Sequence, residues 1–401
     1  MTSIDQTLLT GRIVTSSGTI EDGVVITASD RILFVGRAAE LPAEHAQARA
    51  PQEWGPGRTL LPGLVDAHCH GGAGGEFGAG VESARTAARH HHRNGTTALL
   101  GSLVSNTPEQ LTAGVTTCAA LVTSGELAGI HLEGPFLSME RRGAQNPAVL
   151  TDVDAPLVES LVQAAADAGA AGALAQMTYA PERRGSDMLP TLLGGLGIIP
   201  ALGHTDADVD TAWASLRRAR EVAPRGGRPL VTHLFNGMPS LHHRDPGPVA
   251  ACLSQAACGD AVLEVIGDGV HLAAGTVRML FDLVGPGAIS LITDSMAASG
   301  MPDGTYQLGG QDVVVADRTA RLAEGGSIAG GVATLLDVVR WCVVEAGIPL
   351  VDAVTAASRT PARTLGLDDV GTLETGRLAD VLVVDDDLAV RAVMRRGQWV
   401  A

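Results

Sequence analysis

Eight short apolar runs separated by segments of helical spacing constrain the fold of this 401-residue chain more than any other feature. Between the runs, segments such as 81–93, 155–168, 208–219 and 274–284 place apolar residues at helical intervals. Eight strand–helix units over about 250 residues are typical of a (β/α)8 TIM barrel, so we predict an α/β fold of that class. The runs are 61–70, 96–104, 127–133, 173–181, 197–205, 229–236, 262–271 and 288–294.

The two ends of the chain differ from its middle. Segments 7–15, 23–27 and 31–36 are β-like and separated by turn residues, and 379–384 and 390–395 have the same character. We therefore predict a small β-sandwich domain built from both chain termini.

The predicted barrel domain covers residues 61–364, and residues 1–60 and 365–401 form the two parts of the β-sandwich domain. Inside the barrel domain we expect an inserted hairpin over 300–323 and a further helix over 332–346.

Histidines and acids recur where the predicted strands end. The C-terminal ends of the strands carry the active site in TIM barrels, and a random scatter of these residue types would not follow that edge. A site at this rim is therefore predicted. The residues are His70, Glu133, His204, His233, His271 and Asp294.

His68 and His70 lie two residues apart on the first predicted strand, so both imidazoles point to the same side. Two histidines on one face can chelate one divalent ion. The alternative is a pair of hydrogen-bonded core histidines. Cys69 points the other way by the same alternation, so we expect it to pack and not to bind metal.

Glu133 ends an apolar run, where a carboxylate is costly to bury unless it is paired or binds a metal. With His204 and His233 it gives three ligands and an open position, which a hydrolytic metal site needs. The mixed imidazole and carboxylate set predicts a divalent ion, zinc by preference, with one or two ions per subunit. A solvated loop acid is the alternative reading of Glu133.

Asp294 ends the last predicted strand, where it could take a proton from water and return it to a leaving amine. A structural aspartate capping the next turn is the alternative.

His131 shares the face of Glu133, and either supporting hydrogen bonds or core filling would explain its position. His90, His91 and His92 are expected at a solvated helix end far from the rim, and His242 and His243 in a loop.

Composition excludes several classes of protein. The formal net charge is −16 and no basic stripe is present, so nucleic acid is not an expected partner. No apolar stretch is long enough to cross a membrane, and no signal peptide is indicated. The 5 cysteines form no C-x-x-C pair, which predicts reduced thiols and a cytoplasmic location. The chain has no lysine, so its 28 basic residues are all arginines and a carbamylated-lysine metal bridge is excluded.

Several longer motifs resemble one family from end to end. They include PGLVD at 62–66, HLEGPFL at 131–137, GHT at 203–205, THLFNGM at 232–238, RDPG at 244–247, GDGVH at 267–271, TDSMAASG at 293–300 and GRLADVLVVD at 376–385. On these motifs the chain resembles the N-acetylglucosamine-6-phosphate deacetylases of the amidohydrolase superfamily. The resemblance implies hydrolysis of the N-acetyl group of N-acetyl-D-glucosamine 6-phosphate.

The same resemblance implies roles for particular residues. Glu133, His204 and His233 would bind the metal and Asp294 would be the catalytic acid and base. The remaining residues implied, as contacts of a small phosphorylated amino sugar, are Asn236, the backbone of Gly237, Arg244, His271, Ala144, Ile328, Ala329 and Gly330. A guanidinium fork suits phosphate oxygens, and the resemblance implies a homodimer in which Arg244 reaches the neighbouring active site.

The chain departs from the family pattern at one loop. Residues 142–145 read Arg-Gly-Ala-Gln, so Gln145 stands where the family has a sugar-contacting histidine. We expect Gln145 to hold the sugar, because an amide offers a donor and an acceptor but does not titrate.

Two other activities remain alternatives at this stage. One is removal of the acetyl group from N-acetylgalactosamine 6-phosphate, and the other is a different amidohydrolase acting on a small N-acyl substrate. A non-enzymatic scaffold would lack ligands of the main set, and none is missing.

Overall fold

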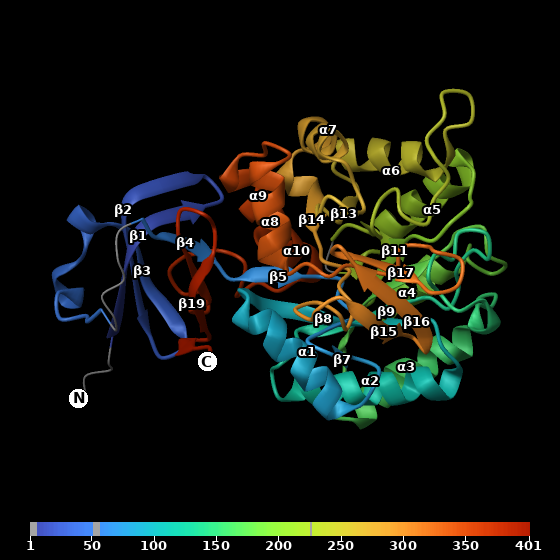
Figure 1. Cartoon of the computed structure of the whole chain (residues 1–401), viewed down its shortest axis with the longest axis horizontal. Coiled ribbons are helices and arrows are strands. Elements are labelled where there is room, and N and C mark those ends of the chain that lie inside the picture. The colour runs from blue at the N-terminus through green and yellow to red at the C-terminus, as the bar shows by residue number, and fades with distance from the viewer. Residues whose placement is uncertain (1–5, 51–56, 225–226) are drawn as a thin grey trace.

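The computed structural model describes residues 6–50, 57–224 and 227–401. It has two parts, a barrel domain and a smaller β domain at one end, and Figure 1 shows the N- and C-terminal segments together in the latter. No helix among these residues is both long and apolar enough to cross a membrane.

The barrel is an eight-stranded parallel sheet in the order β14-β13-β12-β11-β10-β9-β8-β5. Every predicted strand is present in sequence order, so the TIM-barrel prediction is confirmed. The strands are β5 (Leu64–Asp66), β8 (Thr96–Val104), β9 (Gly129–Glu133), β10 (Leu174–Tyr179), β11 (Ile199–Leu202), β12 (Leu230–Val231), β13 (Val262–Val265) and β14 (Ile289–Leu291).

Helices follow the strands and cover the outside of the barrel. Side chains cap the start of some of them; for example, the Asp208 carboxylate accepts a hydrogen bond from the Thr211 N–H at 2.7 Å. The helices are α1 (Val81–Arg93), α2 (Pro108–Thr123), α3 (Ala155–Asp167), α4 (Leu189–Gly195), α5 (Val209–Val222), α6 (Gly247–Ala257), α7 (Ala274–Val284), α8 (Leu335–Val344), α9 (Leu350–Ala356) and α10 (Arg359–Leu365).

The barrel closes just beyond its first and last strands. The Asp294 N–H donates to the His68 carbonyl at 2.9 Å, and the His70 N–H donates to the Ser295 carbonyl at 2.8 Å. These bonds join the segments that follow β14 and β5. The two ends of the strand order, and the site residues that they carry, are therefore brought side by side.

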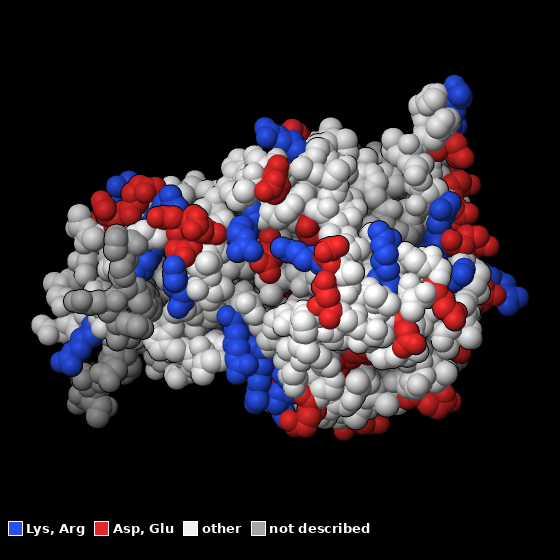
Figure 2. All heavy atoms as spheres, in the orientation of Figure 1, with Lys and Arg blue, Asp and Glu red and all other residues white. Residues whose placement is uncertain are grey.

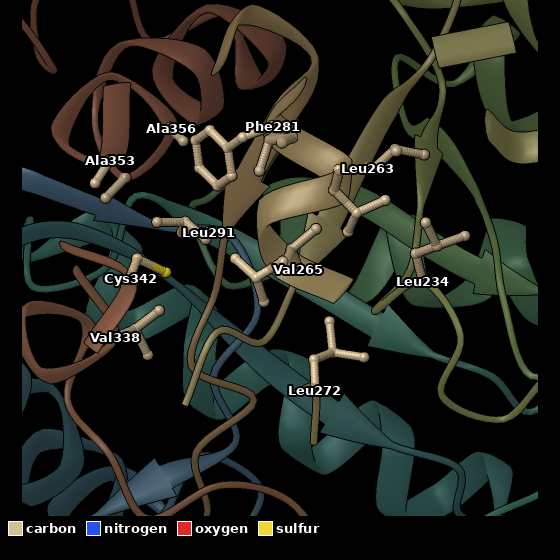
Figure 3. Close-up of a cluster of buried hydrophobic side chains, with 14 of the residues drawn as sticks. Leu234, Leu263, Val265, Leu272, Phe281, Leu291, Val338, Cys342, Ala353 and Ala356 are labelled. Atoms are coloured by element: carbon tan, nitrogen blue, oxygen red, sulfur yellow. The ribbon is translucent and has the colours of Figure 1, made fainter. Parts of the chain in front are cut away.

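Apolar side chains fill the layer between the strands and the helices. In one cluster, Leu263, Val265 and Leu291 of the strands meet Phe281 of α7 and Val338 of α8 (Figure 3). All five are at least 92% buried, which leaves little room for movement of the strands. The strand ends that carry the site therefore stand on a rigid base.

The β domain contains one seven-stranded sheet in the order β20-β19-β18-β4-β1-β2-β3. The prediction of a β domain built from both termini is confirmed. The predicted strand at 61–70 is divided, because residues up to Pro62 pair in this sheet and the barrel strand begins at Leu64. The strands are β1 (Gln6–Thr15), β2 (Gly18–Ala28), β3 (Arg31–Arg37), β4 (Thr59–Pro62), β18 (Val381–Val384), β19 (Val390–Arg395) and β20 (Gln398–Trp399).

Two small sheets lie near the mouth of the barrel. The expected hairpin is a three-stranded sheet of β15 (Gly304–Leu308), β16 (Gln311–Ala316) and β17 (Thr319–Leu322). The second sheet pairs β6 (Gly71–Gly72) with β7 (Gly75–Glu76). Helix α1 packs on β6, and His91 and His92 at its C-terminal end are buried.

Candidate metal centre and active site

The side chains predicted for the metal meet at the C-terminal ends of the strands. They form two groups in which the candidate ligand atoms lie within 4.8 Å of one another: Glu133 with His204 and His233, and His68 with His70 and Asp294. All six residues are buried or nearly so, with Asp294 the most exposed at 9%. The structure thus brings together ligands from five strands.

Glu133 stands between the two groups. Its Oε1 lies 2.9 Å from His204 Nε2 and 3.0 Å from His233 Nε2, and its Oε2 lies 3.2 Å from His70 Nε2. Burial alone would raise the pKa of Glu133, but the charge of His68 and the bonds with His204 and His233 hold that pKa well below its usual range. The carboxylate is therefore ionised and placed to contact either group.

The backbone turns sharply at three of these residues. His204, His233 and Asp294 have φ values of 46°, 27° and 47°, in the left-handed region that residues other than glycine seldom adopt. Such conformations each cost on the order of 1–3 kcal/mol and cluster at functional sites. All three residues lie just past the end of a strand, where the chain leaves the sheet.

The chemistry of the donors fits a divalent cation. His70 Nδ1 faces the Ser102 carbonyl at 3.2 Å and His204 Nδ1 faces the Arg141 carbonyl at 2.8 Å. A carbonyl only accepts, so both Nδ1 atoms carry a proton and a neutral ring keeps its lone pair on Nε2.

These Nε2 atoms converge. His68 Nε2 lies 3.0 Å from that of His70, and His204 Nε2 lies 3.1 Å from that of His233. Lone pairs that face one another and a carboxylate require a cation between them. In keeping with this, bonds with Asp294 and Glu133 overcome the opposing effect of burial and raise the pKa of His70 well above its ordinary value.

Asp294 faces the second group from the end of β14. Its Oδ1 lies 3.3 Å from His70 Nε2 and 3.4 Å from His68 Nε2. Burial would raise the pKa of Asp294, but the charges of His68 and His70 outweigh burial and lower it to about 2. Asp294 is therefore a carboxylate that can accept a proton.

An open cavity of about 280 Å³ lies over the two groups. Most residues implied for the sugar line it, whereas Arg244 and Ala329 do not. The predicted residues along the wall are Ala144, Gln145, Asn236, Gly237, His271, Ile328 and Gly330. Gly143 and Ser327 also line this cavity and were not predicted.

Gln145 is already bonded at both ends of its amide. Its Nε2 donates to Glu133 Oε2 at 2.6 Å, and its Oε1 accepts from the Ser105 N–H at 2.8 Å. The side chain therefore contacts a candidate ligand besides lining the cavity.

Arg244 lies on an exposed loop between β12 and α6. This loop projects from the barrel domain beside α6, and Figure 2 shows a basic side chain at its tip. His242 and His243 lie on the same exposed loop, as expected.

The histidines at the end of α1 correct a prediction. They were expected in solvent and far from the rim, but His91 and His92 are buried. His91 Nε2 lies 2.9 Å from the Gly71 carbonyl and 3.1 Å from Ser295 Oγ, directly behind the segment that follows Asp294. Cys69 lies 3.2 Å from the same nitrogen, on the side away from His68, as its alternation predicted.

Sequence reasoning missed two acids that support histidines. Glu264 on β13 bonds His68 Nδ1 at 3.1 Å, and Asp268 bonds His271 Nδ1 at 2.8 Å. Glu264 carries the same signal as Glu133, an acid inside an apolar strand. His131, left open between two readings, bonds Ser102 and Thr178, and its ring lies edge-on to that of His68 with 4.4 Å between the ring centroids.

Comparisons with known proteins show the family of this chain. The sequence signature of the Amidohydrolase family matches residues 59–400. The N-acetylglucosamine-6-phosphate deacetylase of Bacillus subtilis (strain 168) is 31% identical over 394 residues, covering 96% of this chain and 94% of that protein. The human protein of the same name is 33% identical and covers 86% of this chain and 84% of its own length.

Solved structures give the same result. A mutant of N-acetyl-D-glucosamine-6-phosphate deacetylase from Mycobacterium smegmatis, in complex with N-acetyl-D-glucosamine 6-phosphate, is 38% identical, with a TM-score of 0.90 over 99% of this chain and 100% of that one. The enzyme from Thermotoga maritima is 26% identical, with a TM-score of 0.83 over 98% of this chain and 99% of its own.

Proposed function

Since this chain belongs to the amidohydrolase family and, within it, to the N-acetylglucosamine-6-phosphate deacetylases, we propose that it hydrolyses N-acetyl-D-glucosamine 6-phosphate. The products are glucosamine 6-phosphate and acetate, in amino sugar catabolism. The observation that carries the proposal is the position of Asp294, ionised and beside the converging imidazoles, in a cavity lined by the residues implied for the sugar.

Asp294 moves the proton in the proposed reaction. A divalent ion held by Glu133, His204 and His233 would supply Lewis acidity toward the amide carbonyl and the attacking water. Asp294 accepts a proton from this water as the oxygen adds to the carbonyl carbon, and returns it to the sugar nitrogen as the C–N bond breaks. The geometry supports both roles because Asp294 Oδ1 faces the cavity beside His70.

The proposed sugar site extends away from the metal ligands. Asn236, the Gly237 backbone and His271 would contact the sugar phosphate, and Ala144 and the turn at 328–330 would line the sugar. The bond from Asp268 outweighs burial and raises the pKa of His271, which favours a cationic ring near an anion.

The loop position of Arg244 supports a homodimer. This guanidinium does not line the cavity of its own chain and projects outward on an exposed loop. In the proposed assembly it binds the substrate phosphate of the neighbouring subunit.

The expected ion is zinc, at one or two per subunit. Dialysis against a chelator should abolish turnover, and added Zn²⁺ should restore it. Full activity in protein verified as metal-free by elemental analysis would contradict this expectation.

The 5 free cysteines support a reducing, cytoplasmic compartment as the proposed location.

Steady-state kinetics on three sugars test the proposed function. We expect the highest kcat/KM with N-acetylglucosamine 6-phosphate, a lower value with N-acetylgalactosamine 6-phosphate, and poor turnover of unphosphorylated N-acetylglucosamine. A higher kcat/KM with N-acetylgalactosamine 6-phosphate would make that compound the substrate. An equal kcat/KM with unphosphorylated N-acetylglucosamine would mean that the enzyme does not recognise the phosphate.

A further inference from the structure

Glu264 is a carboxylate in the interior of the barrel that no step of the proposed reaction uses. It lies on β13, inside an apolar strand, and is 0% exposed. Its Oε2 bonds His68 Nδ1 at 3.1 Å, and its Oε1 accepts a hydrogen bond from Gln176 Nε2 at 2.9 Å. Gln176, from β10, also donates to the Ala67 carbonyl at 3.1 Å, so Glu264 is held from two sides.

An anion at this depth needs a compensating charge. Among the described residues, the only ion-pair partner of Glu264 is His68. No arginine of the described ranges forms an ion pair with it, and the chain has no lysine. The positive charge that compensates the Glu264 carboxylate must therefore lie on the His68 ring or on a cation that this ring binds.

The bond with Glu264 also fixes how His68 presents its other nitrogen. Because Nδ1–H donates to the carboxylate, the Nε2 lone pair points toward His70 Nε2 at 3.0 Å and Asp294 Oδ1 at 3.4 Å. A carboxylate on the far nitrogen orients an imidazole ligand and makes it a stronger donor.

The other group of ligands lacks such an anion. His204 Nδ1 is bonded to the neutral carbonyl of Arg141, and His233 Nδ1 has no hydrogen-bond partner among the described residues. Loss of the Glu264 charge should therefore act on one group and spare the other.

Resting on the proposed function, we propose that Glu264, held by Gln176, is the positioning residue that makes His68 a metal ligand and sets the affinity of the His68–His70–Asp294 group for a divalent ion. Glu264 touches neither substrate nor ion. It acts through His68 alone.

Metal titration of the full-length protein tests this role without any substrate. Protein stripped with a chelator is titrated with Co²⁺, and the bound ions are followed by visible absorption and by elemental analysis after gel filtration. We expect two ions per subunit in the parent. In Glu264→Gln one site should keep its affinity and the other should weaken about 10- to 100-fold.

Two further variants test the same role if Glu264→Gln folds poorly. Gln176→Met should weaken the same site by a smaller factor, because it removes only the support of Glu264. Asp380→Asn is the matched control, since Asp380 is a buried carboxylate of the β domain bonded to the Arg396 N–H. It should leave both sites unchanged.

Unchanged binding at both sites in Glu264→Gln would overturn the role, as would equal weakening of both sites or a parent that binds only one ion. Because no sugar is present, these outcomes are separate from a failure of the proposed activity. An enzyme with another substrate would still show the selective loss of one site.

Discussion

Asp294 is the side chain on which the proposed chemistry depends most. We expect Asp294→Asn to lower kcat by about 10²–10⁴-fold, because an amide cannot accept the water proton. Any loss of metal should be confined to the group that Asp294 shares with His68 and His70, and the ion at Glu133 should remain. Measurement of kcat with metal analysis on the same sample checks both. An Asn variant within a few-fold of the parent would mean that another group carries the proton.

Gln145 links the sugar cavity to Glu133. We expect Gln145→Ala to lower kcat/KM about tenfold, since Glu133 Oε2 loses a hydrogen bond worth about 0.5–1.5 kcal/mol and the sugar loses a polar neighbour. Gln145→His should keep kcat within about tenfold of the parent, because one neutral hydrogen bond replaces another. Steady-state kinetics of both variants decide. A gain of orders of magnitude in kcat for the histidine variant would show that this position transfers a proton.

Single residues also show where sequence reasoning stops. Glu133 could be predicted, because it ends a run at the rim beside other candidates. Glu264 has the same local signal, yet its partner His68 is 196 positions away in the chain. Strand alternation gives the side to which His68 points but not which strand lies across the barrel from it. Supporting residues of this kind depend on tertiary packing.

At the scale of elements, the order and type of the barrel strands could be predicted but their ends could not. The apolar run at 229–236 predicts a full strand, whereas β12 ends at Val231. The chain leaves the sheet there because the backbone turns to a φ of 27° at His233. Apolar periodicity does not report such a turn, since the residues beyond it, such as Leu234, stay buried.

His90 on helix α1 makes the free energy of unfolding depend on pH. Burial and the nearby charge of His91 lower the pKa of His90 to about 4 from the ordinary 6.5. Between these two values the unfolded chain binds a proton that the folded chain does not, so the free energy of unfolding decreases as pH falls through this window. His90→Gln should lose less stability than the parent between pH 7 and pH 5.

Urea unfolding midpoints at these two pH values, measured for both proteins, test the His90 prediction. Groups remote from α1 titrate alike in the two proteins, so the difference between them reports His90 together with its effect on His91. Equal losses would show that His90 does not contribute.

At the scale of the whole molecule, a mixing experiment tests the dimer. Arg244→Ala and Asp294→Asn should each be nearly inactive with the phosphorylated sugar. In a mixed dimer, the site with an intact Asp294 receives an intact Arg244 from its neighbour, so mixing and exchange should restore activity to about a quarter of the parent in a symmetric dimer. If Arg244 binds the phosphate in the active site of its own subunit, mixing should restore no activity. The parent mixed with the double variant is the control.

The sheet shared by both ends of the chain has a consequence for synthesis. Strand β4 pairs with β1 on one side, and its other edge stays open until β18 is made, roughly 320 residues later. At a ribosomal rate of about 5–20 residues per second, this delay is on the order of half a minute. During that time the nascent chain carries an exposed strand edge, which is a template for wrong pairing. The strands of the barrel are therefore synthesised before β18, β19 and β20 complete the seven-stranded sheet.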